Sequence, residues 1–287
     1  MKTTTAVTSA AVTLKQAEPI KLQKRIGSTV YTVSIRFSDK ATETMTSASL
    51  GAGLARHGKS VLCLDADTQH SLTVSFGVTE PEKLPVTLTT MMSHIINESG
   101  FDPLDGIVHH AEGIDLLPSN STLAGMEIAL VQLIGRETIL RQYIEMVKPF
   151  YDYVIVDCAP SLDLLSINAL AAADSVIIPV VPKYLDAKGL ELLLKSIAQI
   201  RRQINPALTI GGILLTMVDR RAIFTREIIT LIESAYGSHI RIFGEHIPRS
   251  VRAAETTAQG ISIFAHDPHG KVAAAYAALT GEVLEVA

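Results

Sequence analysis

Short apolar runs that alternate with stretches of helical spacing restrict the fold of this sequence most strongly. The runs 61–64 and 153–157 are apolar apart from the final Asp of the second. Before them, Leu50, Leu54 and Ala55 recur at the spacing of one helix face. Strands that are apolar on both faces belong in a parallel sheet covered by helices on both sides, so the pattern predicts a doubly wound, mostly parallel α/β protein. We expect further strands at 30–37, 114–118, 176–180, 208–217 and 240–243, and helices at 47–58, 87–97, 123–147 with a break near Gly135, 162–173, 188–204, 225–236 and 271–286.

Two of the predicted strands end in acidic residues. Asp65 and Asp67 follow the run 61–64, and Asp157 ends the run 153–157. The carboxyl ends of parallel strands meet at the edge where ligands bind, and carboxylates there can hold Mg²⁺ directly or through water. An Asp at such a position can also cap the following helix. Because both strands end in this way, the sequence favours metal–phosphate chemistry over capping.

Composition and charge exclude several classes of protein. A chain of 287 residues with a hydrophobic fraction of 47% suits one large α/β domain, with or without an appendage. A net charge of −4 does not indicate a strongly basic nucleic-acid protein, although it allows a local basic patch. Cys63 and Cys158 lie in apolar runs and are expected to be small buried side chains. Asp174 and Pro179 interrupt the longest apolar stretch, 169–181, so we expect no membrane-spanning helix. The stretch 272–287 lacks the basic face of an amphipathic anchor, so we expect no membrane partner. The N-terminus does not resemble a signal peptide, so we expect a cytoplasmic location.

Changes in the periodicity of apolar residues along the chain predict three segments. Residues 1–26 lack periodicity and are expected to form a loose tail. Residues 27–46 are expected to form an atypical strand and loop, and residues 47–287 the α/β domain. Apolar and polar residues alternate over 30–37, which is typical of a strand with one buried face, such as an edge strand. We expect no separate DNA-reading domain, because the segment before Ser47 is too short for a helix-turn-helix unit and a linker.

Several motifs after residue 47 resemble the ParA and Soj partition ATPases, relatives of MinD with deviant Walker motifs. The stretch 58–69 is similar to the family's second motif, which usually ends D-x-D-P-Q, and the stretch 154–161 is similar to its Walker B strand. Later family signatures are matched at 168–174, 212–219, 247–252 and 264–268. The resemblance implies a fold of the P-loop NTPase type and an ancestry among ATPases that segregate DNA.

The resemblance also implies roles for individual residues. Asp67 would position the attacking water or Mg²⁺, and Asp157 would be the Walker B aspartate, so these two are the implied catalytic and metal-binding residues. The residues implied in nucleotide binding are Thr44, Asp65, Thr216 and Pro248. The residues implied in contact with non-specific DNA are Arg220, Arg221, Arg249 and Arg252, for which ordinary solvated surface is the alternative. The implied cofactors are ATP and Mg²⁺; the implied partners are a second ParA-like subunit, DNA and a ParB-like adaptor, at the nucleoid.

The chain departs from this family at the phosphate-binding loop. Counting back from residues 50–55, the family's K-G-G-V-G-K-T-T falls on residues 38–45, which read S-D-K-A-T-E-T-M. No glycine occurs between Gly27 and Gly51, and Glu43 replaces the phosphate-binding lysine. Glycines let consecutive N–H groups surround phosphate oxygens, and the lysine neutralises their charge. We therefore expect nucleotide binding and hydrolysis to be impaired.

Residues 21–38 resemble a second family, the small conjugative-transposon proteins of the TnpW type. This resemblance suggests that a mobile-element fragment has replaced the first strand and P-loop of a ParA-like protein. The replaced strand is expected to be central and apolar on both faces, whereas Thr32, Ser34 and Arg36 alternate with apolar residues. Polar groups pressed against a helix layer are costly unless they are paired. The sequence alone does not decide whether residues 30–37 fill the central position.

Two functions follow from these observations. The first is a ParA-like partition protein of a plasmid or mobile element, in which ATP bridges two subunits that coat DNA. The second is a non-catalytic relative that binds DNA or a partner, or regulates an intact ParA by forming a heterodimer with it. A fusion relic without a selected function is a third alternative.

Overall fold

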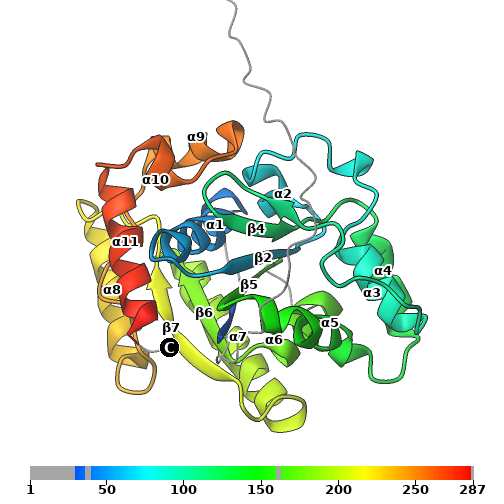
Figure 1. Cartoon of the computed structure of the whole chain (residues 1–287). Helices are drawn as coiled ribbons and strands as arrows, with labels where there is room; N and C mark the ends of the chain where they lie inside the picture. Colours follow the sequence, from blue (N-terminus) through cyan, green and yellow to red (C-terminus); the bar gives the residue numbers. More distant parts are fainter. Residues whose placement is uncertain (1–29, 36–39, 160–162, 286–287) are drawn as a thin grey trace, which may run out of the picture.

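A seven-stranded sheet between two layers of helices forms the part of the chain that the computed structural model describes, residues 30–35, 40–159 and 163–285 (Figure 1). The strand order is β3-β4-β2-β5-β1-β6-β7, and only the pair of β3 and β4 is antiparallel. This confirms the predicted doubly wound α/β fold. The strands are β1 (Val30–Ile35), β2 (Val61–Ala66), β3 (Val108–His109), β4 (Ile114–Leu117), β5 (Tyr153–Cys158), β6 (Ser175–Val180) and β7 (Thr209–Leu215).

The helices divide between the two faces of the sheet. One face is covered by α3 (Leu88–Ile96), α4 (Leu123–Val131), α5 (Ile139–Val147), α6 (Leu164–Ala172), α7 (Tyr184–Gln203) and α8 (Ile223–Tyr236). The other face is covered by α1 (Lys40–Arg56), α2 (Ser71–Ser75), α9 (Val251–Gln259), α10 (Ile263–His266) and α11 (Lys271–Leu284). Across the described helices, none combines the length and apolar character that crossing a bilayer requires.

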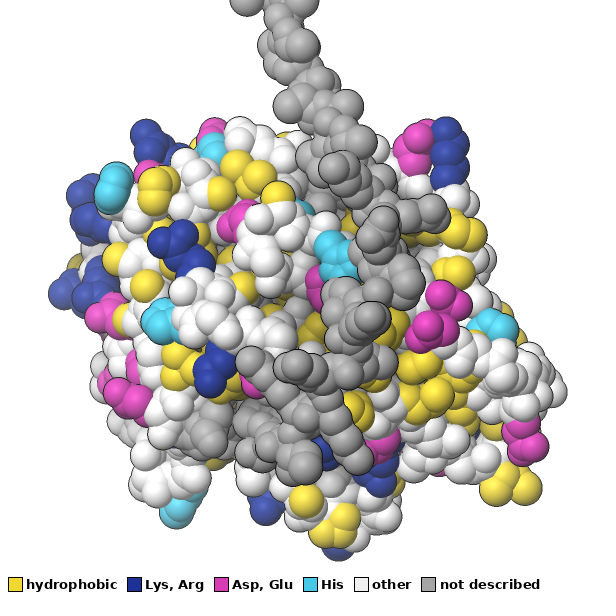
Figure 2. Space-filling model, in the orientation of Figure 1, with side chains coloured by type: hydrophobic (Ala, Val, Ile, Leu, Met, Phe, Trp, Pro, Cys, Tyr) yellow, Lys and Arg dark blue, Asp and Glu magenta, His cyan; other side chains and the backbone are white. Residues whose placement is uncertain are grey.

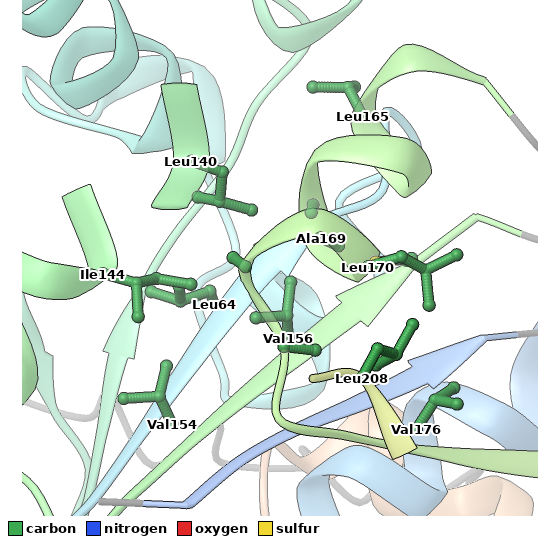
Figure 3. Packing of buried hydrophobic residues seen from close by; sticks show 14 of the residues in the cluster. Leu64, Leu140, Ile144, Val154, Val156, Leu165, Ala169, Leu170, Val176 and Leu208 are labelled. Carbon is green, nitrogen blue, oxygen red and sulfur yellow. The ribbon is translucent and has the colours of Figure 1, made fainter. Parts of the chain in front are cut away.

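The alternation of side chains along each strand separates two hydrophobic cores. In β2, Leu62 and Leu64 belong to one core, whereas Val61 and Cys63 belong to the other. Figure 3 shows part of the first core, in which Leu64 and Val156 from neighbouring strands pack with residues of α5 and α6. Each such fully buried aliphatic side chain stabilises the fold by about 1.5–3 kcal/mol. Odd-numbered and even-numbered residues of such a strand are therefore both apolar, as the sequence pattern requires.

Strand β1 lies in the interior of the sheet and not at an edge. It pairs in parallel with β5 along its full length, from Val30 opposite Tyr153 to Ile35 opposite Cys158, and with β6 on its other side. The alternation over 30–37 suits an edge strand, but the sequence left the position open, and the structure shows that residues 30–35 take the central one. Backbone hydrogen bonding to two neighbours outweighs the one-sided pattern of the side chains. The TnpW-like segment thus supplies the first central strand.

Other elements differ from the sequence expectations at their ends or in their type. Helix α1 begins at Lys40, so residues 40–46 are helical where the sequence pattern predicts a loop. The predicted strand at 240–243 reduces to one isolated bridge between Ile242 and Ile213. The break near Gly135 is confirmed, because Gly135 has a left-handed backbone with φ of 71° between α4 and α5. Helices α2, α9 and α10 and the short strand β3 are additions to the predicted elements.

Helix α1 is enclosed between the sheet and α11, and small residues make both contacts possible. A Cβ on Gly51 would lie 3.0 Å from Cys63 Sγ on the sheet side. A Cβ on Gly53 would overlap Thr280 Oγ1 on α11. Earlier on the helix, Thr46 Oγ1 is 3.0 Å from the Tyr276 hydroxyl, a buried hydrogen bond between the same two helices. The register of α1 against α11 is therefore set by both sterics and hydrogen bonding.

Substitution of Gly53 tests this close approach. Gly53→Ala should lower the free energy of unfolding by about 1–3 kcal/mol, because the new methyl group overlaps Thr280 even though Ala favours a helix. Urea denaturation measures the effect. Gly281→Ala on α11, where a Cβ meets nothing within 4 Å, is the matched control and should be neutral or stabilising. Thr280→Ala should restore part of the lost stability, and equal stability of Gly53→Ala and wild type would contradict the packing described.

Candidate functional site

Two buried aspartates lie side by side at the carboxyl edge of the sheet. Asp65 on β2 and Asp157 on β5 are paired in the parallel register, so their side chains project from the same face of the sheet. Neither is exposed to solvent. Asp67, just beyond the end of β2, is 2% exposed. The structure therefore places the three carboxylates that the sequence pattern selected at the same edge of the sheet.

Asp65 connects three segments through its carboxylate. Thr73, in the first turn of α2, donates to Asp65 Oδ2 from both its N–H and its hydroxyl, each at 2.7 Å. The Asp67 N–H donates to Asp65 Oδ1 at 3.2 Å. The Thr73 hydroxyl in turn accepts the N–H of Ser119, just after β4, at 2.9 Å. Asp65 thus ties the end of β2 to the N-terminus of α2 and to the end of β4.

Asp157 and Asp67 have hydrogen-bond partners of their own. The Ser47 hydroxyl on α1 donates to Asp157 Oδ1 at 2.7 Å. Asp67 Oδ1 accepts the N–H of Gln69 at 3.0 Å, which forms a local turn after β2. Thr44, which precedes Ser47 on α1, is also buried. The N-terminal part of α1 therefore lies against the acidic end of the site.

Burial controls the protonation of the groups around Asp157. Burial and, second, the charge of Asp157 raise the pKa of Asp65 to about 7, although the donors from Thr73 and Asp67 act in the opposite direction. Burial, followed by the charges of Asp157 and Asp115, raises the pKa of the Cys63 thiol far above its ordinary range. Cys63 is therefore a protonated, buried side chain, as expected for a small hydrophobic residue.

The two other residues implied in nucleotide binding lie near one another, beyond the end of β7. Thr216 is fully buried, and its hydroxyl has no hydrogen-bond partner among the residues that the structure describes. The next residue, Met217, has a left-handed backbone with φ of 54°, which is unusual for a side chain of this kind. Val218 then pairs with Pro248 in an isolated parallel bridge. A buried hydroxyl without a partner, beside a strained residue, is the feature here that points to a ligand.

The four arginines implied in DNA contact are all exposed. Arg220 and Arg221 follow the strand end that carries Thr216, and the Arg249 N–H donates to the carbonyl of Val218. These three therefore come from segments that lie next to one another. Arg252 instead forms an ion pair with Asp267 at 3.0 Å, so its charge is partly neutralised.

The sequence analysis missed the residues that support the carboxylates. Ser47, Thr73 and Ser119 donate to Asp157, Asp65 and the Asp67 carbonyl, respectively. The available signal was a hydroxyl side chain in the first turn of a helix for Thr73 and just after a strand for Ser119, whereas Ser47 lies inside α1. Over the described ranges, no three His, Cys, Asp or Glu side chains form a metal-ligand set. The hard oxygen donors nevertheless suit Mg²⁺, which commonly takes one or two carboxylates and completes its shell with waters and phosphates.

The raised pKa of Asp65 predicts a pH-dependent stability. Because the folded state binds this proton more tightly than the unfolded chain does, its contribution is complete below the ordinary pKa of 3.8 and is lost as the pH rises through about 7. Asp65→Asn cannot ionise and should remove a slope of up to about 1.4 kcal/mol per pH unit from the free energy of unfolding in this window. Urea denaturation at several pH values measures it. The exposed control Asp105→Asn should keep the slope, and equal slopes in wild type and Asp65→Asn would contradict the assignment.

Comparison with known proteins identifies relatives of this chain. The family model described as AAA domain matches residues 40–210, and the model of the transposon-encoded protein TnpW matches residues 22–47. The sporulation initiation inhibitor protein Soj of Bacillus subtilis is 38% identical over 241 residues, which cover 84% of this chain and 92% of the relative. The chromosome-partitioning ATPase Soj of Thermus thermophilus is 36% identical and covers 84% of this chain and 90% of its own length.

The fold is shared with solved structures as well. A crystal structure of cobyrinic acid a,c-diamide synthase from Mycobacterium smegmatis with bound ADP and magnesium is 30% identical, with a TM-score of 0.77 over 90% of this chain and 95% of that one. A plasmid partition protein of Borrelia burgdorferi has a TM-score of 0.69 over 91% of this chain at 21% identity, which shows the fold alone. Together with the family model and the Soj relatives, these matches show that the chain belongs to the AAA-domain family of the Soj and ParA partition ATPases.

Proposed function

We propose that this chain is a ParA-like DNA partition protein of a plasmid or mobile element whose nucleotide binding and hydrolysis are impaired. The family supports the first part, since Soj of Thermus thermophilus is described as a chromosome-partitioning ATPase. A single observation carries the second part: residues 38–45 contain neither a glycine nor a lysine at the phosphate-binding position. The AAA-domain match begins only at residue 40, inside this stretch.

The chemistry of the substituted loop supports impaired phosphate binding. Residues 40–45 belong to helix α1, whose N–H groups beyond its first turn are directed into the helix and not toward a ligand. Glu43 adds a negative charge at the position where relatives carry the lysine. In a poorly solvated site that already holds Asp65 and Asp157, one further like charge near a triphosphate costs about 4 kcal/mol.

The remainder of the site supports retention of the metal-binding half. Asp67 and Asp157 would hold Mg²⁺, and Thr44, Asp65, Thr216 and Pro248 would lie around the nucleotide. Bound Mg²⁺ would supply charge neutralisation to the transferred phosphoryl group. Asp65 positions the backbone of Asp67, and Ser47 holds Asp157, so the carboxylates keep their arrangement without a ligand. ADP and magnesium in the related cobyrinic acid a,c-diamide synthase are consistent with such a site.

A second candidate function is a non-catalytic module that binds DNA or regulates an intact ParA-like subunit. The observation that favours it is the satisfied state of the carboxylates, because Asp65 accepts three hydrogen bonds from within the chain. In either function the proposed partners are a second ParA-like subunit, non-specific DNA at the nucleoid and a ParB-like adaptor. We also infer that residues 27–46 derive from a mobile element and that residues 47–287 form the ParA-like domain, with residues 1–26 as a tail.

Nucleotide titration tests whether the phosphate-binding site is impaired. Isothermal calorimetry with ATP or ADP and Mg²⁺ should give no binding heat, and millimolar nucleotide should not change the melting temperature. The reason is that residues 38–45 lack the glycines that let consecutive N–H groups surround phosphate oxygens. Replacing residues 38–45 with K-G-G-V-G-K-T-T should restore binding. The matched control combines this replacement with Asp157→Asn and should bind Mg²⁺-nucleotide more weakly. Tight binding of Mg²⁺-ATP by the unaltered chain would contradict the proposal that nucleotide binding is impaired.

The arginine surface makes a separate prediction. Arg220→Ala and Arg221→Ala together should weaken DNA binding and reduce the slope of log affinity against log salt by about 0.9 for each phosphate that the protein no longer neutralises. Fluorescence anisotropy with duplex DNA at several salt concentrations measures the slope. Arg201→Ala with Arg202→Ala, an exposed arginine pair at the end of α7, is the control and should leave it unchanged. An unchanged slope in the first pair would show that this surface does not bind DNA.

A further inference from the structure

The first turn of helix α8 carries an aromatic ring that is exposed to solvent. Phe224 is 55% exposed, whereas every other Phe or Tyr side chain whose burial the structure describes is buried or partly buried. Among the described residues, no other ring and no cation packs on the faces of Phe224. A single exposed apolar side chain is ordinary on a protein surface, so its surroundings decide what it means.

Arginines from two segments surround the start of α8. The turn before the helix closes through a hydrogen bond of 3.2 Å from the Ala222 N–H to the Asp219 carbonyl. The Arg249 N–H donates to the Val218 carbonyl, which holds the segment before α9 beside this turn. Figure 2 shows Lys and Arg side chains gathered along the left of the view, where Figure 1 draws α8 and α9. We define the α8 surface as six exposed residues: Arg220, Arg221, Ile223, Phe224, Arg226 and Arg249.

A shallow hollow of about 430 Å³ adjoins this surface on the outer side of α8. It is lined by Ile223, Arg226, Glu227 and Thr230. A guanidinium donates hydrogen bonds in pairs, a carboxylate accepts them, and a hydroxyl does either. These are the groups that pair with the edges of nucleobases. Two turns of one helix therefore combine positive charge, an aromatic ring and hydrogen-bonding side chains.

This combination distinguishes between the anionic partners that arginines attract. An anionic membrane would take up Ile223 and Phe224, but it would also bring the exposed carboxylate of Glu227, one turn after Ile223, against negative headgroups. A DNA duplex presents its phosphates to the arginines and keeps its bases stacked inside, so the ring would gain little. An unpaired strand offers phosphates to the arginines and the face of a base to the ring. The α8 surface therefore fits an unpaired strand best.

We propose that the α8 surface binds unpaired DNA, with one base stacked on the ring of Phe224 and the neighbouring phosphates at Arg220 and Arg221. Every base has an aromatic face, so this contact tolerates any sequence. The inference rests on the DNA contact of the proposed function, and it adds the form of DNA that the surface prefers. It requires neither bound nucleotide nor a second subunit.

Two strands with equal charge separate the ring from the arginines. Fluorescence anisotropy compares binding of the full chain to a thymidine oligonucleotide and to an abasic strand of the same length, which has the same phosphates but no bases. Wild type should bind the thymidine strand about 5–150-fold more tightly, the range that stacking of one base provides. Phe224→Leu keeps an apolar side chain without the ring, so it should lose most of this preference and bind the abasic strand like wild type.

A control and a spectroscopic variant complete the experiment. Ile128→Ala removes a side chain that is 73% exposed on α4, which Figure 1 draws on the other side of the molecule from α8, and it should keep the full preference. The chain contains no tryptophan, so Phe224→Trp introduces a single fluorescent ring. This variant should retain the preference, and the thymidine strand should quench its fluorescence whereas the abasic strand should not. Circular dichroism confirms folding of each variant.

Three results would overturn the stacked base. These are equal affinity of wild type for the two strands, an unchanged preference in Phe224→Leu, and binding to phosphatidylserine vesicles that needs Phe224 when oligonucleotide binding does not. The proposed function fails in a different way. If duplex DNA binds through Arg220 and Arg221 but bases add nothing, only the stacked base is wrong. If these arginines do not affect duplex binding, the DNA contact of the proposed function is wrong.

Discussion

Two carboxylates fixed at adjacent positions of a parallel register are the constraint on which the rest of this site depends. The register of β2 and β5 places Asp65 next to Asp157, and both are fully buried. Buried like charges repel, so the surrounding elements must supply donors or a proton. Thr73 on α2 and Ser47 on α1 meet this requirement. The positions of α1 and α2 against the sheet edge are therefore connected to the chemistry of the acids.

The sequence was sufficient for the elements whose side chains all face hydrophobic surroundings. Runs such as 61–64 and 153–157 are apolar because alternate residues point into the two hydrophobic cores on opposite faces of the sheet. Few folds other than a parallel sheet covered by helices on both faces fit such runs. It was insufficient for β1, where pairing with β5 and β6 decides the position. It also failed at 240–243, where apolar residues pack into a core without extended pairing.

The sequence predicted the three carboxylates of the candidate site but not the hydroxyl residues that hydrogen-bond to them. Asp65, Asp67 and Asp157 each lie at the end of a strand, so topology alone brings them to one edge. Thr73 and Ser119 come from segments separated in sequence by 46 positions, and a hydroxyl residue carries no periodic signal. That the Thr216 hydroxyl has no hydrogen-bond partner in the described part of the chain is likewise visible only when its surroundings are known. Resemblance to a family located Thr216, whereas the packing gives the reason to regard it as a ligand contact.

The central position of β1 has a consequence for synthesis on the ribosome. Val30 pairs with Tyr153, and Thr32 pairs with Ser175, so β1 pairs with neighbours that are translated much later than itself. Until β5 and β6 have been synthesised, the N–H and C=O groups of β1 lack the two strands with which they pair in the folded sheet. Because β1 lies between β5 and β6, it also joins β6 and β7 to the rest of the sheet. Completion of the sheet is therefore a late, long-range event in the growth of the chain, of the kind that favours slow folding and makes nascent chains depend on chaperones.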